Sequence, residues 1–173
     1  MSNSETQDVG IVVERRKLNN PWQEWSWRAV ALAPAIENAI PWQVLNRSEG
    51  WVRYFAGTLP ILLHRTETAS YRDNLSVAEP QVYVILRADK SSDDFPYRPY
   101  LATVAPDEAQ THLENGEDIV DAVPMPDEVA AWVMSFIERH HVETAVYKRQ
   151  RKPYDPRKGG PPPVSGAGGR EGS

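Results

Sequence analysis

The chain has 173 residues, of which 40% are hydrophobic and 25% charged, with six tryptophans and a net charge of −5. These values fit one globular domain with a single core better than a disordered chain. Because no cysteine is present, disulfides, thiolate metal sites, iron–sulfur ligation by this chain and cysteine nucleophiles are excluded.

The start of the sequence indicates where the protein works. Residues 1–8 are polar and acidic, without the basic and apolar regions of a secretory signal. No apolar run approaches the roughly 20 residues that a membrane-spanning helix needs. We therefore expect a cytoplasmic protein with no membrane insertion, and we expect residues 1–8 to be disordered.

Apolar runs rich in β-branched and aromatic residues predict strands over the first two thirds of the chain. These strands cover residues 10–17, 25–32, 51–56, 59–65, 81–87 and 100–104. Gly57-Thr58 reads as a tight connection that makes its two flanking strands antiparallel neighbours. The near-continuous apolar run 81–87 is expected at the centre of the sheet. Residues 66–75 stay open between a short helix and an irregular corner.

Two segments predict helices. Pro106 with two following acidic residues opens a short helix that Asn115-Gly116 ends, and residues 117–123 return as a short extended piece. The main helix covers Asp127–His141. Its apolar positions recur at helical spacing and are Val129, Trp132, Val133, Phe136, Ile137 and His140. We expect it to pack on the sheet and to be followed by an extended apolar segment over 142–147.

The charge is unevenly distributed. Residues 148–160 carry a net +5 and the remainder carries −10. Lys148, Arg149, Arg151 and Lys152 form a basic cluster directly after the extended segment, and we assign them as candidate partner-binding residues. A solvated tail that aids solubility is the alternative interpretation. From residue 153 onward, proline, glycine and serine dominate, which predicts disorder over 153–173.

These elements predict an α+β fold with one globular domain over residues 9–152. It consists of a twisted antiparallel sheet, possibly a partly closed barrel, packed by one long C-terminal helix and one short helix.

Catalytic patterns are weak throughout. No glycine-rich phosphate loop and no Gly-x-Ser-x-Gly run occurs. His140-His141 is a poor metal pair, because adjacent helical residues point about 100° apart. Ser70, His64 and Asp73 make a triad only on paper. We therefore assign no catalytic, cofactor-binding or metal-binding residue and expect no cofactor.

The tryptophans allow two interpretations. Trp22, Trp25 and Trp27 could form a stacking platform for bases, but the surrounding strands are not basic, and alternating tryptophans favour core packing. Trp22 and Trp42 lie beside prolines and are better candidates for exposed partner-binding anchors.

Several short motifs together resemble one family. They are Asn20-Pro21-Trp22, the run 82–87, Val123-Pro124-Met125-Pro126, Trp132-Val133, and His140-His141-Val142 through Tyr147-Lys148-Arg149. The chain resembles, over roughly residues 10–152, a bacterial domain family of unknown function that is commonly encoded near molybdenum-dependent formate dehydrogenase genes. The resemblance implies a setting in formate dehydrogenase assembly, maturation or regulation, and transfers no catalytic residue.

Three functions remain to be weighed. The first is a non-catalytic accessory or interaction protein that binds a formate dehydrogenase component or a companion accessory protein. The second is a cofactor-handling enzyme or binder for a nucleotide or molybdenum-pterin ligand, whose phosphates would suit either Arg15, Arg16 and Lys17 or the basic tail. The third, nucleic-acid binding through the tail and tryptophans, fits poorly with an acidic body. We favour the first, and the sequence does not fix the oligomeric state.

Overall fold

The structure is a computed structural model, and it describes residues 3–114 and 116–150, with side chains as far as residue 140. Residues up to His141 form one compact unit, and Val142–Ser173 form a second, of which only helical residues to Gln150 are described. The strands are β1 (Ser4–Lys17), β2 (Trp25–Pro34), β3 (Gln43–Ser48), β4 (Trp51–His64), β5 (Gln81–Ala88), β6 (Tyr97–Thr103) and β7 (Ile119–Pro124). The helices are η1 (Arg65–Glu67), α1 (Thr68–Leu75), α2 (Pro106–Leu113) and α3 (Asp127–Gln150).

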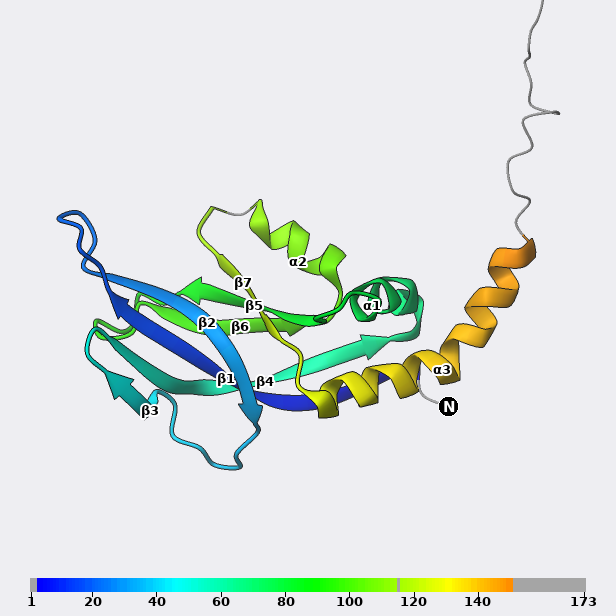
Figure 1. The fold of residues 1–173 in the computed structure, drawn as a ribbon, viewed down its shortest axis with the longest axis horizontal. Helices are drawn as coiled ribbons and strands as arrows, with labels where there is room; N and C mark the ends of the chain where they lie inside the picture. Colours follow the sequence, from blue (N-terminus) through cyan, green and yellow to red (C-terminus); the bar gives the residue numbers. More distant parts are fainter. Residues whose placement is uncertain (1–2, 115, 151–173) are drawn as a thin grey trace, which may run out of the picture. The chain divides into compact units, whose positions relative to one another are not determined.

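The seven strands form one sheet in the order β2-β1-β4-β6-β5-β7, with β3 also paired to β4. All pairs are antiparallel except β4 with β6. The sheet twists and curls into a nearly closed barrel, with α2 on the side of β5 and β7 and α3 beside β1 (Figure 1). The predicted α+β class and partly closed barrel are therefore confirmed. The segment 66–75, for which a short helix and an irregular corner were both open, forms the end of the 3-10 helix η1 and the helix α1.

Strand β1 is paired along both edges, and each of its partners, β2 and β4, has a bulge opposite the middle of β1. The register with β4 shifts between Ile11 and Val12, opposite Gly57, whose φ of +156° favours glycine. The predicted hairpin at Gly57-Thr58 is therefore wrong: residues 51–64 are one continuous strand with a bulge. A glycine between two apolar runs signals either a tight turn or a bulge, and here the unbroken partner β1 holds both halves in line.

A side chain joins the two ends of the sheet. Strands β2 and β7 share no ladder among the described residues, but the Asp121 carboxylate on β7 accepts the Ala29 backbone N–H of β2 at 2.9 Å. The Arg28 guanidinium lies 4.0 Å from the same carboxylate. Burial raises the pKa of Asp121, against the opposing effects of the Ala29 N–H and Arg28. A partly buried carboxylate thus substitutes for backbone pairing at the seam.

The core lies between the inner face of the sheet and the predicted apolar face of α3. Val129, Val133 and Phe136 of α3 are buried in the cluster that includes Val13 and Leu86. The run 81–87 is confirmed as a buried strand, β5, with Val82, Val84, Ile85 and Leu86 fully buried. Its predicted central position is wrong, because β5 lies next to β7 at one end of the strand order, although it is paired on both edges.

The N-terminal segment is a strand and not the expected disordered tail. Residues 4–8 pair with the C-terminal half of β4. Glu5 accepts the Trp132 indole N–H at 3.0 Å and pairs with Arg139 of α3. Hydrogen bonding by Arg139 is the largest cause that holds the pKa of Glu5 below its ordinary value. The polar composition of residues 1–8 predicted disorder. That prediction failed because the segment pairs with β4, which is distant in the sequence.

Helix α3 extends beyond its predicted end. The expected extended segment 142–147 is helical, and the helix continues to Gln150. No glycine or proline interrupts residues 127–150, and glutamate, alanine, lysine, arginine and glutamine favour helix. The expected disorder of 153–173 concerns residues outside the described part of the chain.

Substituting Gly10 tests the packing of β1. A Cβ at this position would lie 2.4 Å from Cε2 of Phe55, a side chain that is only 2% exposed. We expect Gly10→Ala to lower the free energy of unfolding by about 1–3 kcal/mol, measured by urea denaturation. Gly116→Ala is the matched control, because a Cβ there meets nothing within 4 Å. An equal loss in both variants would contradict the close approach of Phe55.

Substituting Asp121 tests the seam. Because burial raises the pKa of Asp121 in the folded state, its protonated carboxyl group stabilises the fold at low pH. This contribution is lost as the pH rises through the folded pKa. Asparagine keeps the acceptor and removes the buried charge, so Asp121→Asn should be at least as stable as the wild type at pH 7. Its advantage should shrink as the pH falls. Asp121→Ala leaves the Ala29 N–H without its acceptor and should lose about 1–3 kcal/mol. Similar losses for both variants in denaturation curves would contradict this role.

Candidate partner-binding site

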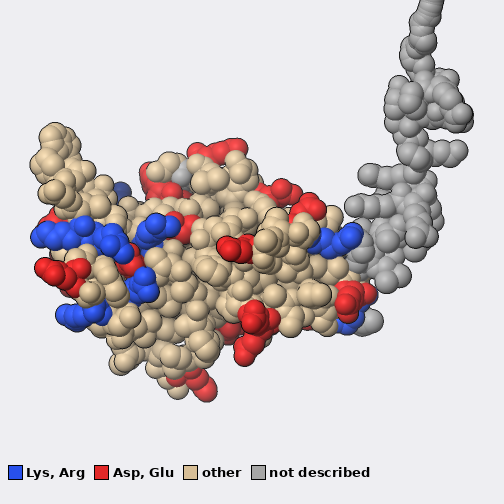
Figure 2. Space-filling model, in the orientation of Figure 1, with Lys and Arg blue, Asp and Glu red and all other residues tan. Residues whose placement is uncertain are grey.

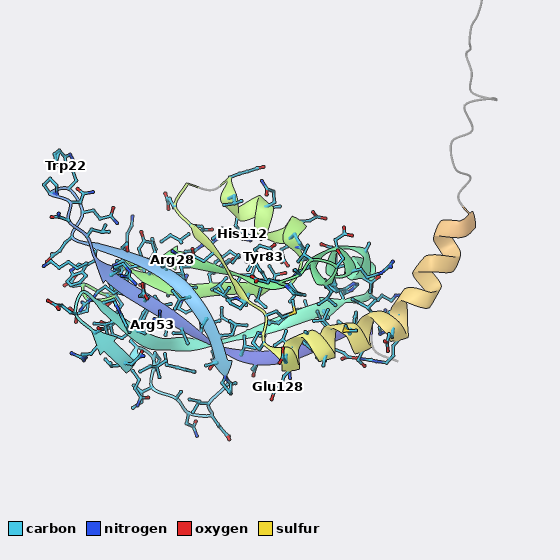
Figure 3. All side chains as sticks on the ribbon, viewed as in Figure 1. Trp22, Arg28, Arg53, Tyr83, His112 and Glu128 are labelled. Atoms are coloured by element: carbon cyan, nitrogen blue, oxygen red, sulfur yellow. The ribbon has the colours of Figure 1, made fainter. Side chains whose placement is uncertain are left out.

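The turn between β1 and β2 presents an exposed tryptophan. This tip, residues 18–24, projects beyond the strands, with Trp22 near its end (Figure 3). Leu18 donates its N–H to the Glu24 carbonyl at 2.9 Å, and the Asn20 Oδ1 accepts the Trp22 N–H at 2.8 Å. Trp22 is 84% exposed. The tip therefore holds a large aromatic side chain in water on an ordered turn.

The strands that support the tip carry exposed cations. Lys and Arg side chains gather at this end of the body, with acidic residues between them (Figure 2). The exposed cations on these strands are Arg16, Lys17, Arg28 and Arg47. Glu14 is 3% exposed and lies between Arg16, at 2.9 Å, and Arg53, at 3.0 Å. Burial by itself would raise the pKa of Glu14, but hydrogen bonds from Arg53 and Arg16 hold it below its ordinary value.

Trp42, the second predicted anchor, lies in a different environment. Its ring stacks on Phe95 with centroids 4.4 Å apart and contacts Trp27 and Tyr54 edge-on. Its backbone is left-handed, with φ of +65°, and its N–H bonds the Phe55 carbonyl at 2.7 Å. Trp42 is thus half-buried in an aromatic cluster of Trp27, Trp42, Tyr54 and Phe95, whereas Trp22 stands alone at the tip.

The basic triplet of β1 does not converge on one site. The Arg15 guanidinium lies 4.1 Å from the centre of the Trp25 ring, and Arg15 Nε is buried without a hydrogen-bond partner among the described residues. Arg16 instead pairs with Glu14, and Lys17 lies 3.9 Å from Glu24. Adjacent strand residues point to opposite faces, so Arg16 is separated from Arg15 and Lys17, which both lie over the Trp25 ring.

The remaining predicted partner-binding residues lie on or beyond α3. Lys148 and Arg149 are in its last turn, where only the backbone is described. Arg151 and Lys152 lie outside the described residues. The structure therefore positions Trp22 and Trp42 and leaves the basic cluster as a sequence prediction.

The other ionisable side chains mostly stabilise the fold. Arg87 makes two hydrogen bonds to Asp118, at 3.1 and 3.0 Å, and His112 of α2 lies 3.4 Å from the same carboxylate. Hydrogen bonding by Arg87 is the largest cause that lowers the pKa of Asp118. This cluster fixes α2 and the start of β7 to β5. Its members are spread along the sequence, so no spacing motif could identify them.

The histidines and serines singled out in the sequence do not assemble a reactive centre in the described part of the chain. His64 Nδ1 lies 2.9 Å from Thr66 Oγ1, so its hydrogen-bond partner is Thr66 and not Ser70 or Asp73 of the paper triad. His140 packs on Phe136 with ring centroids 4.4 Å apart. Among the side chains that the structure describes, which extend to residue 140, no group of three potential ligands could hold a metal ion. Over residues 3–114 and 116–150, no helix combines the length and apolarity needed to cross a bilayer.

Fold and surface together define a small α+β domain with a curled sheet. Among its described side chains, the most exposed aromatic group, Trp22, lies on a strand connection. Residues 8–152 match the family described as protein of unknown function (DUF3305), and the chain belongs to this family. No significant match was found among curated proteins or among solved structures.

The two anchor tryptophans should behave differently on substitution. Trp22→Ala removes a side chain that is 84% exposed and should change the free energy of unfolding by less than about 0.5 kcal/mol. Trp42→Ala removes the stacking on Phe95 and should cost about 2–4 kcal/mol, measured by chemical denaturation. A loss for Trp22→Ala as large as that for Trp42→Ala would show that the tip packs against the body.

Proposed function

We propose that this protein is a non-catalytic accessory protein that binds a component of a formate dehydrogenase system, or a companion factor of it, during assembly, maturation or regulation. The formate dehydrogenase setting comes from the sequence resemblance described above. The observation that carries a binding function is the 84% exposure of Trp22 on a projecting, hydrogen-bonded turn.

An exposed tryptophan on an ordered turn can contribute strongly to the free energy of binding a partner. A tryptophan in water offers a large apolar area whose transfer into a partner pocket is favourable, and tryptophan is enriched among residues that dominate binding energy. The Asn20–Trp22 hydrogen bond orders the turn before binding, which reduces the entropy lost on association. Exposed Lys17 and Arg28 near the base would attract a partner whose pocket has an acidic rim.

The alternative, a cofactor-handling protein for a nucleotide or molybdenum-pterin ligand, receives less support. In one expected phosphate site, Arg16 pairs with Glu14 on the face of β1 opposite to Arg15 and Lys17, which both lie over the Trp25 ring. The side chains of the other expected site, the basic tail, lie outside the described part of the chain. Thermal-shift measurements with nucleotides and pterin discriminate, since a tight ligand raises the apparent melting temperature. We expect no shift.

The proposal is tested by affinity purification from the native host with tagged full-length protein, followed by mass spectrometry. The wild type should recover a formate dehydrogenase component or its companion factor, and Trp22→Ala should recover at least tenfold less, because loss of an anchor costs about 2 kcal/mol or more. Leu113→Ala is the matched control, as Leu113 is an exposed apolar residue, 57% accessible, on α2.

Two outcomes would contradict the proposal. Recovery of no component of that system by the wild type would remove the formate dehydrogenase setting. Equal recovery by Trp22→Ala and the wild type would remove the tip as the contact surface.

A further inference from the structure

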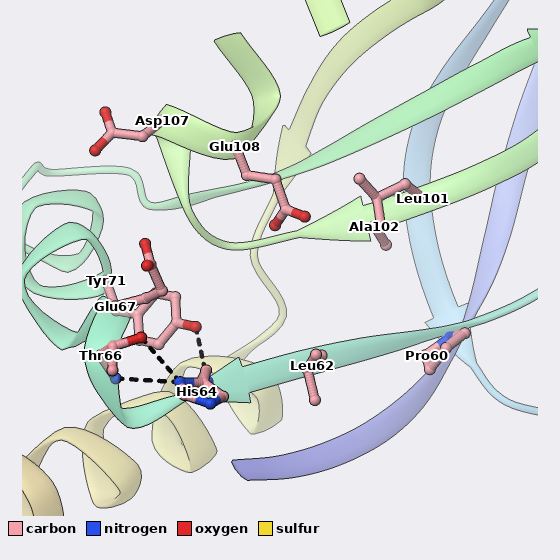
Figure 4. A pocket seen from close by; sticks show the side chains of 10 residues that line it. All are labelled: Pro60, Leu62, His64, Thr66, Glu67, Tyr71, Leu101, Ala102, Asp107 and Glu108. Atoms are coloured by element: carbon pink, nitrogen blue, oxygen red, sulfur yellow. Dashed lines mark hydrogen bonds between the residues drawn. The ribbon is translucent and has the colours of Figure 1, made fainter. Parts of the chain in front are cut away.

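A groove opens where β4 and β6 separate. These parallel strands share one bridged pair, Ile61 with Ala102, and then lead into η1 with α1 and into α2 respectively. The groove between them has a volume of about 770 Å³, within the range of ligand sites. Figure 4 shows Pro60, Leu62 and His64 of β4 along the lower side, Leu101 and Ala102 of β6 at the upper right, and the residues of the helical segments at the left and top. It forms only because segments far apart in the sequence diverge here.

The floor of the groove is apolar and accessible. Pro60 and Leu62 come from β4, and Leu101 comes from β6. Leu62 is 55% exposed, although Leu63 beside it is fully buried. Because successive strand residues alternate between faces, β4 presents one apolar side chain to the core and the next to the groove.

The rim of the groove is acidic. Its lining includes three carboxylates, Glu67, Asp107 and Glu108, and neither lysine nor arginine. Glu108 is held in place by the Thr103 hydroxyl, which donates to its carboxylate at 2.6 Å, and Asp107 and Glu108 both lie in the first turn of α2. The Tyr71 hydroxyl accepts the His64 backbone N–H at 2.9 Å and closes one end.

The charges act together at this position. Burial is the largest cause that raises the pKa of Tyr71, and the negative charges of Glu67 and Glu108 raise it further. Two acids from different elements, η1 and α2, therefore contribute to one negative field.

We propose that this groove binds an extended basic segment of a partner protein, with apolar side chains on the floor and lysine or arginine side chains against the three carboxylates. In an extended chain, alternate residues face opposite directions, so a segment of alternating apolar and basic residues matches an apolar floor between acidic walls. The groove is acidic, whereas the β1–β2 end carries exposed cations and Trp22. The inference does not depend on the proposed function.

Fluorescence anisotropy with the full-length protein tests the proposal. The probe is a short labelled peptide of alternating lysine and valine, and its counterpart carries glutamate in place of lysine. The basic peptide should bind in low salt and the acidic one should not. Glu67→Gln/Asp107→Asn should weaken binding roughly three- to tenfold, because exposed ion pairs contribute modestly and add to one another. Added salt should weaken binding by wild type more than by this variant.

Two controls separate the groove from general attraction. Asp93→Asn/Asp94→Asn makes the same change in net charge in the loop between β5 and β6, outside the groove lining, and should leave the affinity unchanged. Leu62→Ser should weaken peptide binding with no change in charge. Because the Leu62 side chain is exposed, we expect the variant to keep the fold, which circular dichroism checks.

Each remaining outcome overturns the proposal. Absence of peptide binding does so directly. Equal weakening by the loop variant and the groove variant means nonspecific attraction. If spermine displaces the peptide equally well from the wild type and from Leu62→Ser, the groove is a site for small cations and not for a peptide. None of these results depends on Trp22, so failure here is distinguishable from failure of the proposed function.

Discussion

Strand β1 is hydrogen-bonded along both edges, to β2 from Val9 to Lys17 and to β4 from Ser4 to Arg16. The register shifts in these ladders fall within three residues, Ile11 to Val13. Bulges increase local twist, so bulges in both neighbours of β1 at nearly the same level curl the whole sheet. Gly10 lies directly before this stretch, where its missing side chain leaves room for Phe55. The curl brings β7 toward β2, and Asp121 completes the seam through a single side chain.

Both surface features follow from this arrangement. Because β1 and β2 stay paired to their ends, their connection is carried beyond the body, and Trp22 has no neighbour to cover it. At the opposite end of β4, the curvature leaves the strand bridged to β6 by one residue pair, and the groove opens between them. The resulting domain presents an aromatic tip near cations and an acidic groove.

Local patterns predicted the elements whose burial depends on local sequence. The apolar face of α3 and the strand β5 follow from helical spacing and from a run of β-branched residues, and both are buried as expected. The predictions failed where distant partners decide the conformation. Ser4 to Asp8 become a strand only because β4 lies beside them, and Gly57 is a bulge because β1 spans both of its sides. The surroundings of Trp42 depend on Phe95, more than fifty residues away in the sequence, so no local signal distinguished it from Trp22.

Hydrogen exchange, measured on the free protein and on its complex with the captured partner, tests most directly whether a rigid sheet displays the Trp22 tip for binding. The account predicts that amides of β1, β2 and β4 are already protected in the free protein and that binding adds protection at residues 18–24, with little change along the paired strands. New protection spread along β1 and β4, or no change at the tip, would contradict it.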